Sequence, residues 1–319
     1  MDYLITGGAG FIGSNIAEHL VGRGCRVRVF DNFSTGKRAN VQSFATKAEI
    51  FEGDLCDARS IEEAVRGVRY VLHLGAIPSV PRSVENPQAT NEVNITGTVN
   101  LLVAARDAGV KRVVFTSSSS VYGDTPTLPK QEAMLPNPIS PYAVAKLAGE
   151  HYMRCFTRVY GLETVVLRYF NVFGPYQDPT SHYSGVLAIF CRRMLAGEQA
   201  TIFGDGEQSR DFTYIDNVVH ANLLAAAAPA DKVSGQMMNM ATGSRITLNQ
   251  TFRILCELTG YSGEPAYAPS RAGDIRDSLA DIGLAGELLG YKPVVDFRTG
   301  LQRTVEWYRL GGEGIGSRA

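Results

Sequence analysis

The first half of the chain alternates short apolar, β-branched runs with stretches in which apolar residues recur at helical spacing. Buried strands are predicted at 3–6 ("YLIT"), 26–31 ("RVRVFD"), 70–75 ("YVLHLG") and 112–118 ("RVVFTSS"). Helices are predicted at 14–24, 60–67 and 91–109. Strands that alternate with helices in this way are typical of βαβ units. The pattern therefore predicts an α/β fold with a doubly wound parallel sheet of the Rossmann type.

The second half of the chain loses this regularity from about residue 175, where stretches such as "GPYQDPTSHYSG" begin. We expect a smaller C-terminal lobe that closes over the carboxyl edge of the sheet. The main domain is predicted to cover 1–174 and a returning segment at about 211–242. The lobe is predicted at about 175–210 and 243–310, and the Gly-rich tail 311–319 is expected to be frayed.

The composition is that of a globular protein, with 45% hydrophobic residues, 20% charged residues and a net charge of −1. This balance offers no electrostatic footprint for nucleic acid or an anionic membrane. No apolar run reaches the roughly 18 residues of a membrane span. Five scattered cysteines fit reduced thiols, so we expect a cytoplasmic location. The histidines lack metal-ligand spacing, and no metal site is predicted.

A glycine-rich turn follows the first predicted strand. "LITGGAGFIGSNIAEHL" places Gly8, Gly10 and Gly13 in G-x-G-x-x-G spacing, and Gly7 adds an overlapping glycine pattern. Positions without a side chain let backbone amides approach a pyrophosphate at a helix N-terminus. Asp31 ends the second strand, 18 residues after Gly13, close to the spacing expected for a carboxylate that binds ribose hydroxyls. The segment therefore predicts a dinucleotide site.

The choice between NAD and NADP depends on the charges that follow the second strand. Asp31 would repel a 2′-phosphate, which favours NAD, whereas Lys37 and Arg38 would attract one. Asp54, in "GDLCD", fits two roles equally well. It is either an acceptor for the adenine amino group or a helix cap.

The stretch "SPYAVAK" combines a helix start with a candidate acid–base pair. Ser140 is a good N-cap, and Pro141 suits the first helical position. Tyr142 and Lys146 then lie at i and i+4 on one face. A free tyrosine has a pKa of about 10, and a lysine together with a positive nicotinamide would lower it. A serine run in "FTSSSSVYG" lies at a strand's carboxyl end, where it could hydrogen-bond the hydroxyl that the tyrosine deprotonates.

The motifs "TGGAGFIG", "TSSSSVYG", "SPYAVAK" and "RYFNVFGP" together resemble the extended short-chain dehydrogenase/reductase family, in particular its nucleotide-sugar 4-epimerases. The resemblance covers nearly the whole chain. It implies a catalytic triad of Ser118, Tyr142 and Lys146, a recycled NAD, and a UDP-sugar substrate bound partly by the C-terminal lobe. The cofactor contacts that it implies, together with the glycine motif, are Gly7, Gly10, Phe11, Ile12, Gly13, Asp31, Asn32, Asp54, Leu55, Leu74, Asn94, Tyr142 and Lys146.

The resemblance also implies a substrate site. Arg210 and Arg271 would bind the diphosphate, for which planar guanidinium groups are well suited, and Asp274 would contact the ribose. Without the family pattern, a salt bridge from Arg210 to Asp211 and a solvated Arg271 are the simpler interpretations. The full predicted substrate set is Ser118, Ser119, Ser120, Asn171, Arg210, Arg271, Asp274 and Ser278.

Three other functions compete with 4-epimerisation of UDP-hexoses. A 4,6-dehydratase would carry an Asp-Glu pair where this chain has Ser119 and Ser120, so elimination would lack its proton donor. A UDP-glucuronate 4-epimerase or decarboxylase is a closer alternative, because these two serines and Arg82 could bind a carboxylate. A non-enzymatic NAD sensor of the same fold would be expected to lose the triad, which is complete here.

Substrate size is predicted from Ser278, which lies seven residues after Arg271. In the family this position borders the sugar pocket, and a tyrosine there restricts enzymes to glucose and galactose. A serine leaves room for an acetamido group, which predicts that UDP-N-acetylglucosamine and UDP-N-acetylgalactosamine are interconverted, with the plain sugars also accepted. The alternative is a small residue on a surface loop without a substrate contact.

A homodimer is expected from the same resemblance. The helix that ends at Gly109 and the helix that starts at Pro141 resemble the pair that forms the family's intersubunit four-helix bundle. Leu101, Leu102 and Tyr152 would then be apolar residues on an otherwise exposed face.

Overall fold

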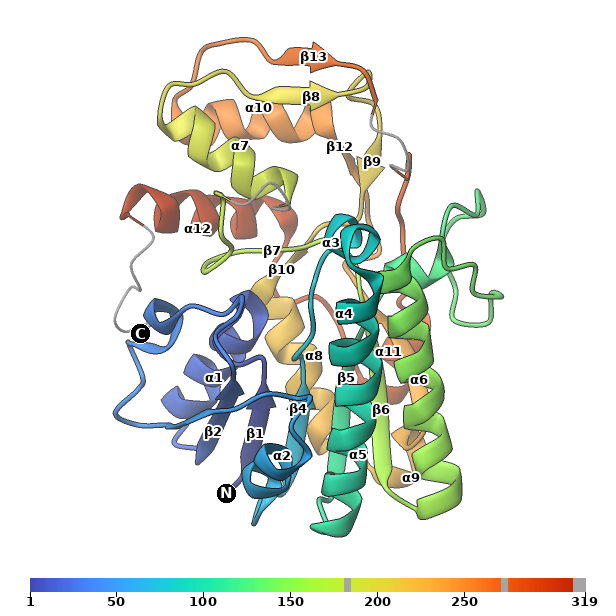
Figure 1. Cartoon of the computed structure of the whole chain (residues 1–319). Coiled ribbons are helices and arrows are strands. Elements are labelled where there is room, and N and C mark those ends of the chain that lie inside the picture. Colours follow the sequence, from blue (N-terminus) through green and yellow to red (C-terminus); the bar gives the residue numbers. More distant parts are fainter. Residues whose placement is uncertain (181–184, 271–274, 312–319) are drawn as a thin grey trace.

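A parallel sheet of seven strands forms the centre of the part of the chain that the computed structural model describes, residues 1–180, 185–270 and 275–311 (Figure 1). The strand order is β11-β6-β5-β4-β1-β2-β3, so the direction of winding reverses between β1 and β4. This confirms the predicted doubly wound fold. The strands are β1 Tyr3–Thr6, β2 Val27–Asp31, β3 Glu49–Glu52, β4 Tyr70–His73, β5 Arg112–Ser118, β6 Glu163–Tyr169 and β11 Gln236–Met240.

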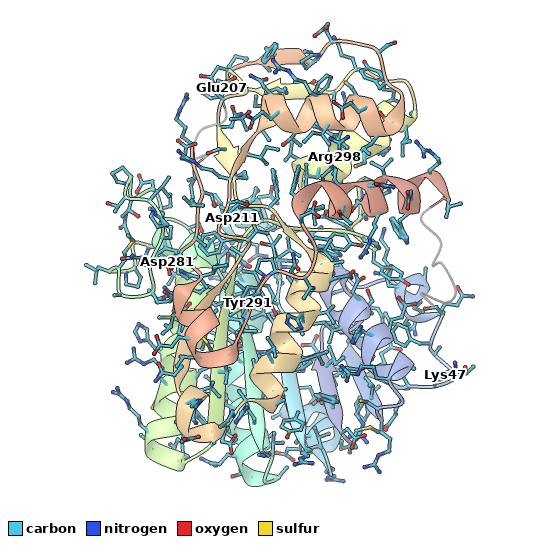
Figure 2. All side chains as sticks on the ribbon, turned by 180° about the vertical axis from the view of Figure 1, so that it is seen from behind. Lys47, Glu207, Asp211, Asp281, Tyr291 and Arg298 are labelled. Atoms are coloured by element: carbon cyan, nitrogen blue, oxygen red, sulfur yellow. The ribbon has the colours of Figure 1, made fainter. Side chains whose placement is uncertain are left out.

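Helices cover both faces of the sheet, because successive strand residues point to opposite sides and both sides are apolar. In β1, Leu4 packs in the core under the first layer of helices, and Ile5 packs in the core under the second. The first layer consists of α2 Ala58–Val65, α5 Gly97–Asp107 and α6 Pro141–Tyr160. The second, seen from behind in Figure 2, consists of α1 Phe11–Gly22, α8 Ile215–Ala227 and α11 Gly283–Leu289.

A smaller lobe lies beyond the carboxyl edge of the sheet, at the top of Figure 1. Its main elements are α7 Val186–Leu195, β8 Thr201–Phe203, α10 Leu248–Thr259, β13 Ala266–Ala268 and α12 Phe297–Arg309. Two-stranded ladders lie in the lobe and at its junction with the main domain. They pair β8 with β13, β9 Ser209–Arg210 with β12 Ile246–Thr247, and β7 Val172–Phe173 with β10 Thr213–Tyr214. Helix α11 lies instead against β11 and α8 of the main domain.

Short helical segments connect the longer elements. They are α3 Val80–Glu85, α4 Pro87–Asn91, α9 Ala230–Val233, a π-helical stretch Glu92–Thr96, and 3₁₀ turns Arg38–Val41 and Ser119–Tyr122. The long helix predicted at 91–109 is therefore divided, with the π-helical stretch leading into α5. Along the described residues, no helix is both long and apolar enough to cross a bilayer. The tail expected to be frayed falls, from residue 312 on, outside the described residues.

The predicted dimer face is wrong for two of its three residues. Leu101 and Leu102 are fully buried, in the core that α5 shares with α2 and the sheet. The sequence pattern misassigned them because α5 is apolar on more than one side. Tyr152 is 39% exposed, as expected. The exposed apolar side chains on these two helices also include Val103, Val144, Val159 and Tyr160. A homodimer through this outward set stays a prediction.

Replacing Leu102 by alanine should therefore lower the free energy of unfolding by about 2–5 kcal/mol, because it removes a fully buried side chain and leaves a cavity. Chemical denaturation followed by circular dichroism measures this loss. The neighbouring Val103, which is 37% exposed, provides the matched control, and its change to alanine should cost about 0.5 kcal/mol or less. Equal losses for the two variants would contradict the packing described here.

Candidate active site

A groove of about 450 Å³ opens at the point where the winding of the sheet reverses. In open α/β sheets, ligands bind at this place, outside the carboxyl ends of the strands. It is lined mainly by residues at or after the carboxyl ends of β1, β2, β3 and β4, with further residues from β5, the π-helical stretch and α6. The lining residues are Gly7, Gly10, Phe11, Ile12, Gly13, Phe30, Asp31, Asn32, Ser34, Thr35, Gly53, Asp54, Leu55, Leu74, Gly75, Ala76, Ile77, Pro78, Val93, Thr116, Tyr142 and Lys146.

The glycine turn packs so closely that side chains have no room. A Cβ on Gly13 would lie 2.3 Å from the carbonyl oxygen of Gly7. Gly7 itself has φ +67°, and a Cβ there would lie 2.8 Å from the backbone nitrogen of Gly75. Helix α1 starts directly after Gly10, so its unpaired N–H groups and the positive end of its dipole face the groove. The turn is thus a cradle for an anionic group.

Asp31 lies at the end of β2 and is only 7% exposed. Its carboxylate accepts hydrogen bonds from the backbone N–H of Ala9 at 2.9 Å and of Phe33 at 2.8 Å. Burial raises the pKa of Asp31, and these two hydrogen bonds act in the opposite direction. The carboxylate is therefore oriented by the backbone at the rim of the groove, as a ribose ligand would have to be.

Asp54 is not a helix cap, because Asp57 caps α2 by accepting from the N–H of Arg59. Asp54 instead accepts from the Cys56 N–H at 2.8 Å and from the Asn32 side chain at 2.8 Å. Both Asp54 and Asn32 line the groove. The adenine role of Asp54 stays a prediction, and the competing interpretation is removed.

The two basic residues that left NADP open are both engaged with carboxylates. The Lys37 ammonium lies 2.6 Å from Asp178, and the Arg38 guanidinium lies 2.6 Å from Glu52. Arg38 also lies over the ring of Phe33, 4.1 Å from its centroid.

A buried hydrogen-bonded chain supports the wall of the groove at residues 75–77. The Gly75 N–H donates to the Thr6 hydroxyl, which contacts His73 Nδ1 at 2.7 Å. His73 Nε2 lies 2.9 Å from the hydroxyl of Thr98, which donates to the carbonyl of Asn94. Because the Thr98 hydroxyl hydrogen is committed to that carbonyl, it must accept from Nε2–H. The network therefore assigns a neutral imidazole with its proton on Nε2 and with Nδ1 accepting from Thr6.

Asn94, predicted to contact the cofactor, lies behind the groove and is not among its lining residues. Its side chain accepts from the Ile77 N–H at 2.7 Å and donates to the Ile77 carbonyl at 3.1 Å. It lies in the π-helical stretch Glu92–Thr96, an irregularity that is frequent near functional sites. Asn94 thus positions the wall of the groove, and its neighbour Val93 provides the lining surface.

Tyr142 and Lys146 both reach the groove from the first turns of α6. Ser140 caps this helix by accepting from the Ala143 N–H, and Pro141 occupies its first turn, as predicted. The Lys146 ammonium donates to the carbonyl of Thr116 at 2.8 Å and lies 5.8 Å from the centre of the Tyr142 ring.

The protein groups alone raise the pKa of Tyr142 to about 12, mainly by burial, while hydrogen bonding with Ser118 lowers it. The decrease expected from the sequence depends on a positive nicotinamide together with Lys146, and it stays a prediction. Burial also lowers the pKa of Lys146 to about 8, and the nearby Glu150 carboxylate acts to raise it. A further positive charge in the groove would favour the phenolate. The phenolate form that base chemistry needs is therefore favoured by a cation bound beside Tyr142.

The predicted serines lie at the carboxyl end of β5. The Ser118 hydroxyl accepts from the Ser120 N–H at 3.2 Å, which starts the 3₁₀ turn that contains Ser119. The hydroxyl of Ser120 is buried and has no hydrogen-bond partner among the described residues. This oxygen remains able to bind a polar group of a ligand.

Two predicted substrate residues, far apart in sequence, meet at the base of the smaller lobe. The Asn171 side chain donates to the hydroxyl of Ser278 at 3.2 Å and to the carbonyl of Asp211 at 3.1 Å. Asn171 and Arg210 line one cavity of about 190 Å³. Arg271 and Asp274 lie outside the described residues.

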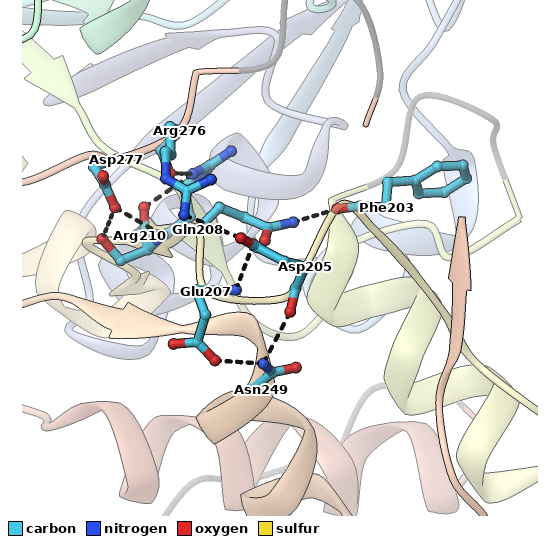
Figure 3. Close-up of polar contacts among 9 residues, drawn as sticks. Phe203, Asp205, Glu207, Gln208, Arg210, Asn249, Arg276 and Asp277 are labelled. Atoms are coloured by element: carbon cyan, nitrogen blue, oxygen red, sulfur yellow. Dashed lines mark hydrogen bonds and ion pairs between the residues drawn. The ribbon is translucent and has the colours of Figure 1, made fainter. Parts of the chain in front are cut away.

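Among the contacts of the described residues, the Asp211 carboxylate is engaged otherwise than in the salt bridge to Arg210 that was the simpler interpretation. The Asp211 carboxylate is buried and accepts from the N–H groups of Thr242, Gly243 and Ala280. The Arg210 guanidinium donates to the carbonyl of Arg276 at 2.8 Å. Figure 3 shows this contact beside the ion pair of Arg276 with Asp205 and the side chain of Asp277, which accepts from Ser209.

Several residues that line the groove were not predicted from the sequence, because they belong to no recognisable motif and reach the groove through the course of the backbone. They are Phe30, Ser34, Thr35, Gly53, Gly75, Ala76, Ile77, Pro78, Val93 and Thr116. Gly75 alone carried a usable signal, since it ends the strand predicted at 70–75 and lies opposite the glycine turn.

The model of the NAD dependent epimerase/dehydratase family matches residues 3–241. The chain belongs to this family. Among relatives, the UDP-glucose 4-epimerase of Mycolicibacterium smegmatis is 40% identical over 313 residues, which cover 97% of this chain and 99% of the relative.

Two solved structures are similar throughout. The UDP-glucose 4-epimerase of Thermotoga maritima, solved with UDP-glucose, has a TM-score of 0.92 and 43% identity, over 98% of this chain and 99% of the other. The UDP-N-acetylglucosamine 4-epimerase of Methanobrevibacter ruminantium, solved with UDP-N-acetylmuramic acid, has a TM-score of 0.92 and 39% identity, over 97% and 98%.

The groove of this epimerase/dehydratase family member fits the NAD that the family uses. Its glycine cradle suits a pyrophosphate, since Cβ atoms at Gly7 and Gly13 would collide with backbone. Asp31 stands at one end of the groove, and Lys146 and Tyr142 line its other part. The donor set therefore matches a dinucleotide with a ribose hydroxyl at one end and a redox-active ring at the other.

The pH dependence of stability tests the neutral state of His73. Burial and, secondarily, the positive charge of Lys146 lower the pKa of His73 to about 3. Below the ordinary value of about 6.5, the unfolded chain binds a proton that the folded protein does not, so stability falls as the pH drops from about 6.5 toward 3. In His73→Gln, the slope of unfolding free energy against pH in this window should be shallower, by up to about 1.4 kcal/mol per pH unit.

Urea denaturation of wild type and variant between pH 4 and 7 measures this difference. The exposed His151 provides the control, because His151→Gln should keep the wild-type slope. Parallel curves for wild type and His73→Gln would refute the neutral state of the buried His73 imidazole.

Proposed function

We propose that the chain is a UDP-hexose 4-epimerase that interconverts UDP-N-acetylglucosamine with UDP-N-acetylgalactosamine and UDP-glucose with UDP-galactose through a 4-keto intermediate. The observation that supports this most is the position of Tyr142 and Lys146, which line the same groove as the glycine turn and Asp31. A base beside the cofactor is what oxidation of a sugar hydroxyl requires. The similar structures solved with UDP-sugars support the substrate class.

When bound, NAD⁺ supplies a hydride acceptor that can return the hydride. The residues of the chain then manage the proton. Tyr142, as phenolate, takes the proton of the sugar C4 hydroxyl, and Ser118 hydrogen-bonds the same oxygen. The Lys146 ammonium, oriented by the Thr116 carbonyl, stabilises the phenolate electrostatically. Once the keto sugar has turned, the opposite face of its C4 carbon would be presented for reduction, and Tyr142 returns the proton to the C4 oxygen.

The sugar must turn while its nucleotide stays in place, so firm contacts belong to the diphosphate. Asn171 and Arg210 line the cavity that suits this group, and the contact of Arg210 with the Arg276 carbonyl fixes part of its guanidinium. The hydroxyls of Ser118 and Ser120 are small contacts that leave the hexose room to rotate.

The acetamido preference is proposed from Ser278. Its hydroxyl accepts a hydrogen bond from Asn171, which lines the cavity, and this contact supports a position for Ser278 beside the substrate. A tyrosine at this position would overpack the wall, at a cost of about 1–3 kcal/mol.

A UDP-glucuronate 4-epimerase is the second candidate. It is favoured by the buried hydroxyl of Ser120, which has no partner within the described part of the chain and could donate to a sugar carboxylate.

The proposed function predicts 4-epimers from a panel of UDP-hexoses without added NAD, because the cofactor is recycled within the protein. Tyr142→Phe should fold normally and lose about 10²–10⁴-fold in turnover, since it lacks the general base. Product sugars are scored by chromatography, with folding checked by circular dichroism. Turnover of UDP-glucuronate alone would select the second candidate, and a fully active Tyr142→Phe would remove the tyrosine from catalysis.

Substrate size provides a separate prediction. Ser278→Tyr should abolish conversion of the acetylated sugars and spare UDP-glucose and UDP-galactose. Ser278→Ala is the matched control, because it removes the hydroxyl without adding volume and should keep both reactions. The ratio of kcat/KM values on the two sugar types measures the effect. An unchanged ratio in the tyrosine variant would show that the gate lies elsewhere.

A further inference from the structure

An ion pair joins the cofactor-binding loop to the approach to the smaller lobe. Lys37 lies in the loop after β2, and Asp178 lies in the segment between β7 and α7. Their charged atoms, Nζ and Oδ2, are 2.6 Å apart. The two residues are 141 positions apart in sequence (178 − 37), so only the tertiary structure brings them together.

Asp178 is held in place independently of the lysine. Its Oδ1 accepts from the N–H and the hydroxyl of Thr180, at 2.8 and 2.6 Å. The backbone on its N-terminal side is also fixed, because Asn15 donates to the Pro175 carbonyl and Tyr308 donates to the Gln177 carbonyl. Burial acts to raise the pKa of Asp178, but the hydrogen bonds from Lys37 and Thr180 outweigh it and hold the pKa at about 2. A fixed carboxylate of this kind is charged at neutral pH.

Lys37 lies close to the ribose end of the groove. Its backbone N–H donates to the carbonyl of Ala9 at 3.0 Å, and the N–H of Ala9 donates to the Asp31 carboxylate at 2.9 Å. The residue before it, Gly36, approaches Asp31 so closely that a Cβ would lie 2.8 Å from the carboxylate. The loop that carries Lys37 thus wraps around the carboxylate proposed to bind the ribose.

A lysine in this position is a natural ligand for a phosphate at the ribose 2′-oxygen, the group that distinguishes NADP from NAD. The contact with Asp178 removes this ligand and adds a negative charge next to it. Arg38, the other nearby cation, is engaged by Glu52 and by the ring of Phe33. We infer that Asp178 is a specificity-determining residue that disfavours NADP by engaging Lys37.

The pair is too exposed to contribute much to the stability of the fold. The side chains of Lys37 and Asp178 are 51% and 32% exposed, and ion pairs of this kind contribute about 0–1 kcal/mol to folding. Its effect should therefore appear in the choice of nucleotide and not in the unfolding transition. The inference rests on the NAD groove of the proposed function and is independent of the sugar substrate.

The test is a nucleotide competition on the purified holoprotein. Wild type and Asp178→Asn are incubated with excess NAD⁺ and NADP⁺ in equal amounts until the bound ratio is constant. Free nucleotide is removed by gel filtration, and bound nucleotide is released by denaturation and quantified. Wild type should retain NAD, and Asp178→Asn should raise the bound NADP:NAD ratio about fivefold, a gain in line with one partly exposed ionic contact.

A double variant and a control make the result specific. Lys37→Gln added to Asp178→Asn should return the ratio to the wild-type value, because the gain is made through the lysine. Glu257→Gln removes a carboxylate from a similar exposed pair, with Arg298, away from the groove, and should leave the ratio unchanged. An unchanged ratio in Asp178→Asn, or an equal rise in the double variant, would overturn the inference. Because no step measures turnover, failure of the proposed epimerase activity would not affect this readout.

Discussion

The close approach of the backbone at the ends of β1 and β4 is the constraint on which the rest of the site depends. Gly13 and Gly7 meet with no space for a Cβ, and Gly7 meets Gly75 in the same way. These contacts bring the N-terminus of α1 to the reversal point of the sheet and join the two walls of the groove. Any side chain at Gly13 would push the helix away and take its N–H groups out of reach of a pyrophosphate.

Behind this groove, polar groups are buried in hydrogen-bonded sets that fix its walls. His73 links Thr6, at the end of β1, through Thr98 to Asn94. Asn94 in turn holds both backbone groups of Ile77. A neutral imidazole satisfies every contact in this chain, whereas a charged one would lie near the cation of Lys146. The buried polar groups therefore define one arrangement, because any other leaves a donor or acceptor unsatisfied.

A second group of buried, hydrogen-bonded polar side chains lies on the other side of Lys146. Glu150, one helical turn further along α6, pairs with Arg168 at 2.6 Å and accepts from Ser117 at 2.5 Å. Both partners of the ion pair are almost completely buried, so its desolvation offsets much of its Coulomb energy. Its effect at the site is electrostatic, because the Glu150 carboxylate opposes the loss of the proton from Lys146.

The sequence by itself determined the fold class, the strands at 3–6 and 112–118, the glycine turn and the start of α6, because these depend on local periodicity and capping. It did not place Leu102, since a helix that is apolar on several sides does not reveal which side faces the core. Only the tertiary structure put Asn94 behind the groove, excluded Asp54 as a cap and brought Lys37 to Asp178. These contacts join residues far apart in the chain, and the burial that raises the pKa of Tyr142 comes from the packing of separate elements. Long-range contacts and burial of this kind leave no periodic pattern in neighbouring sequence positions.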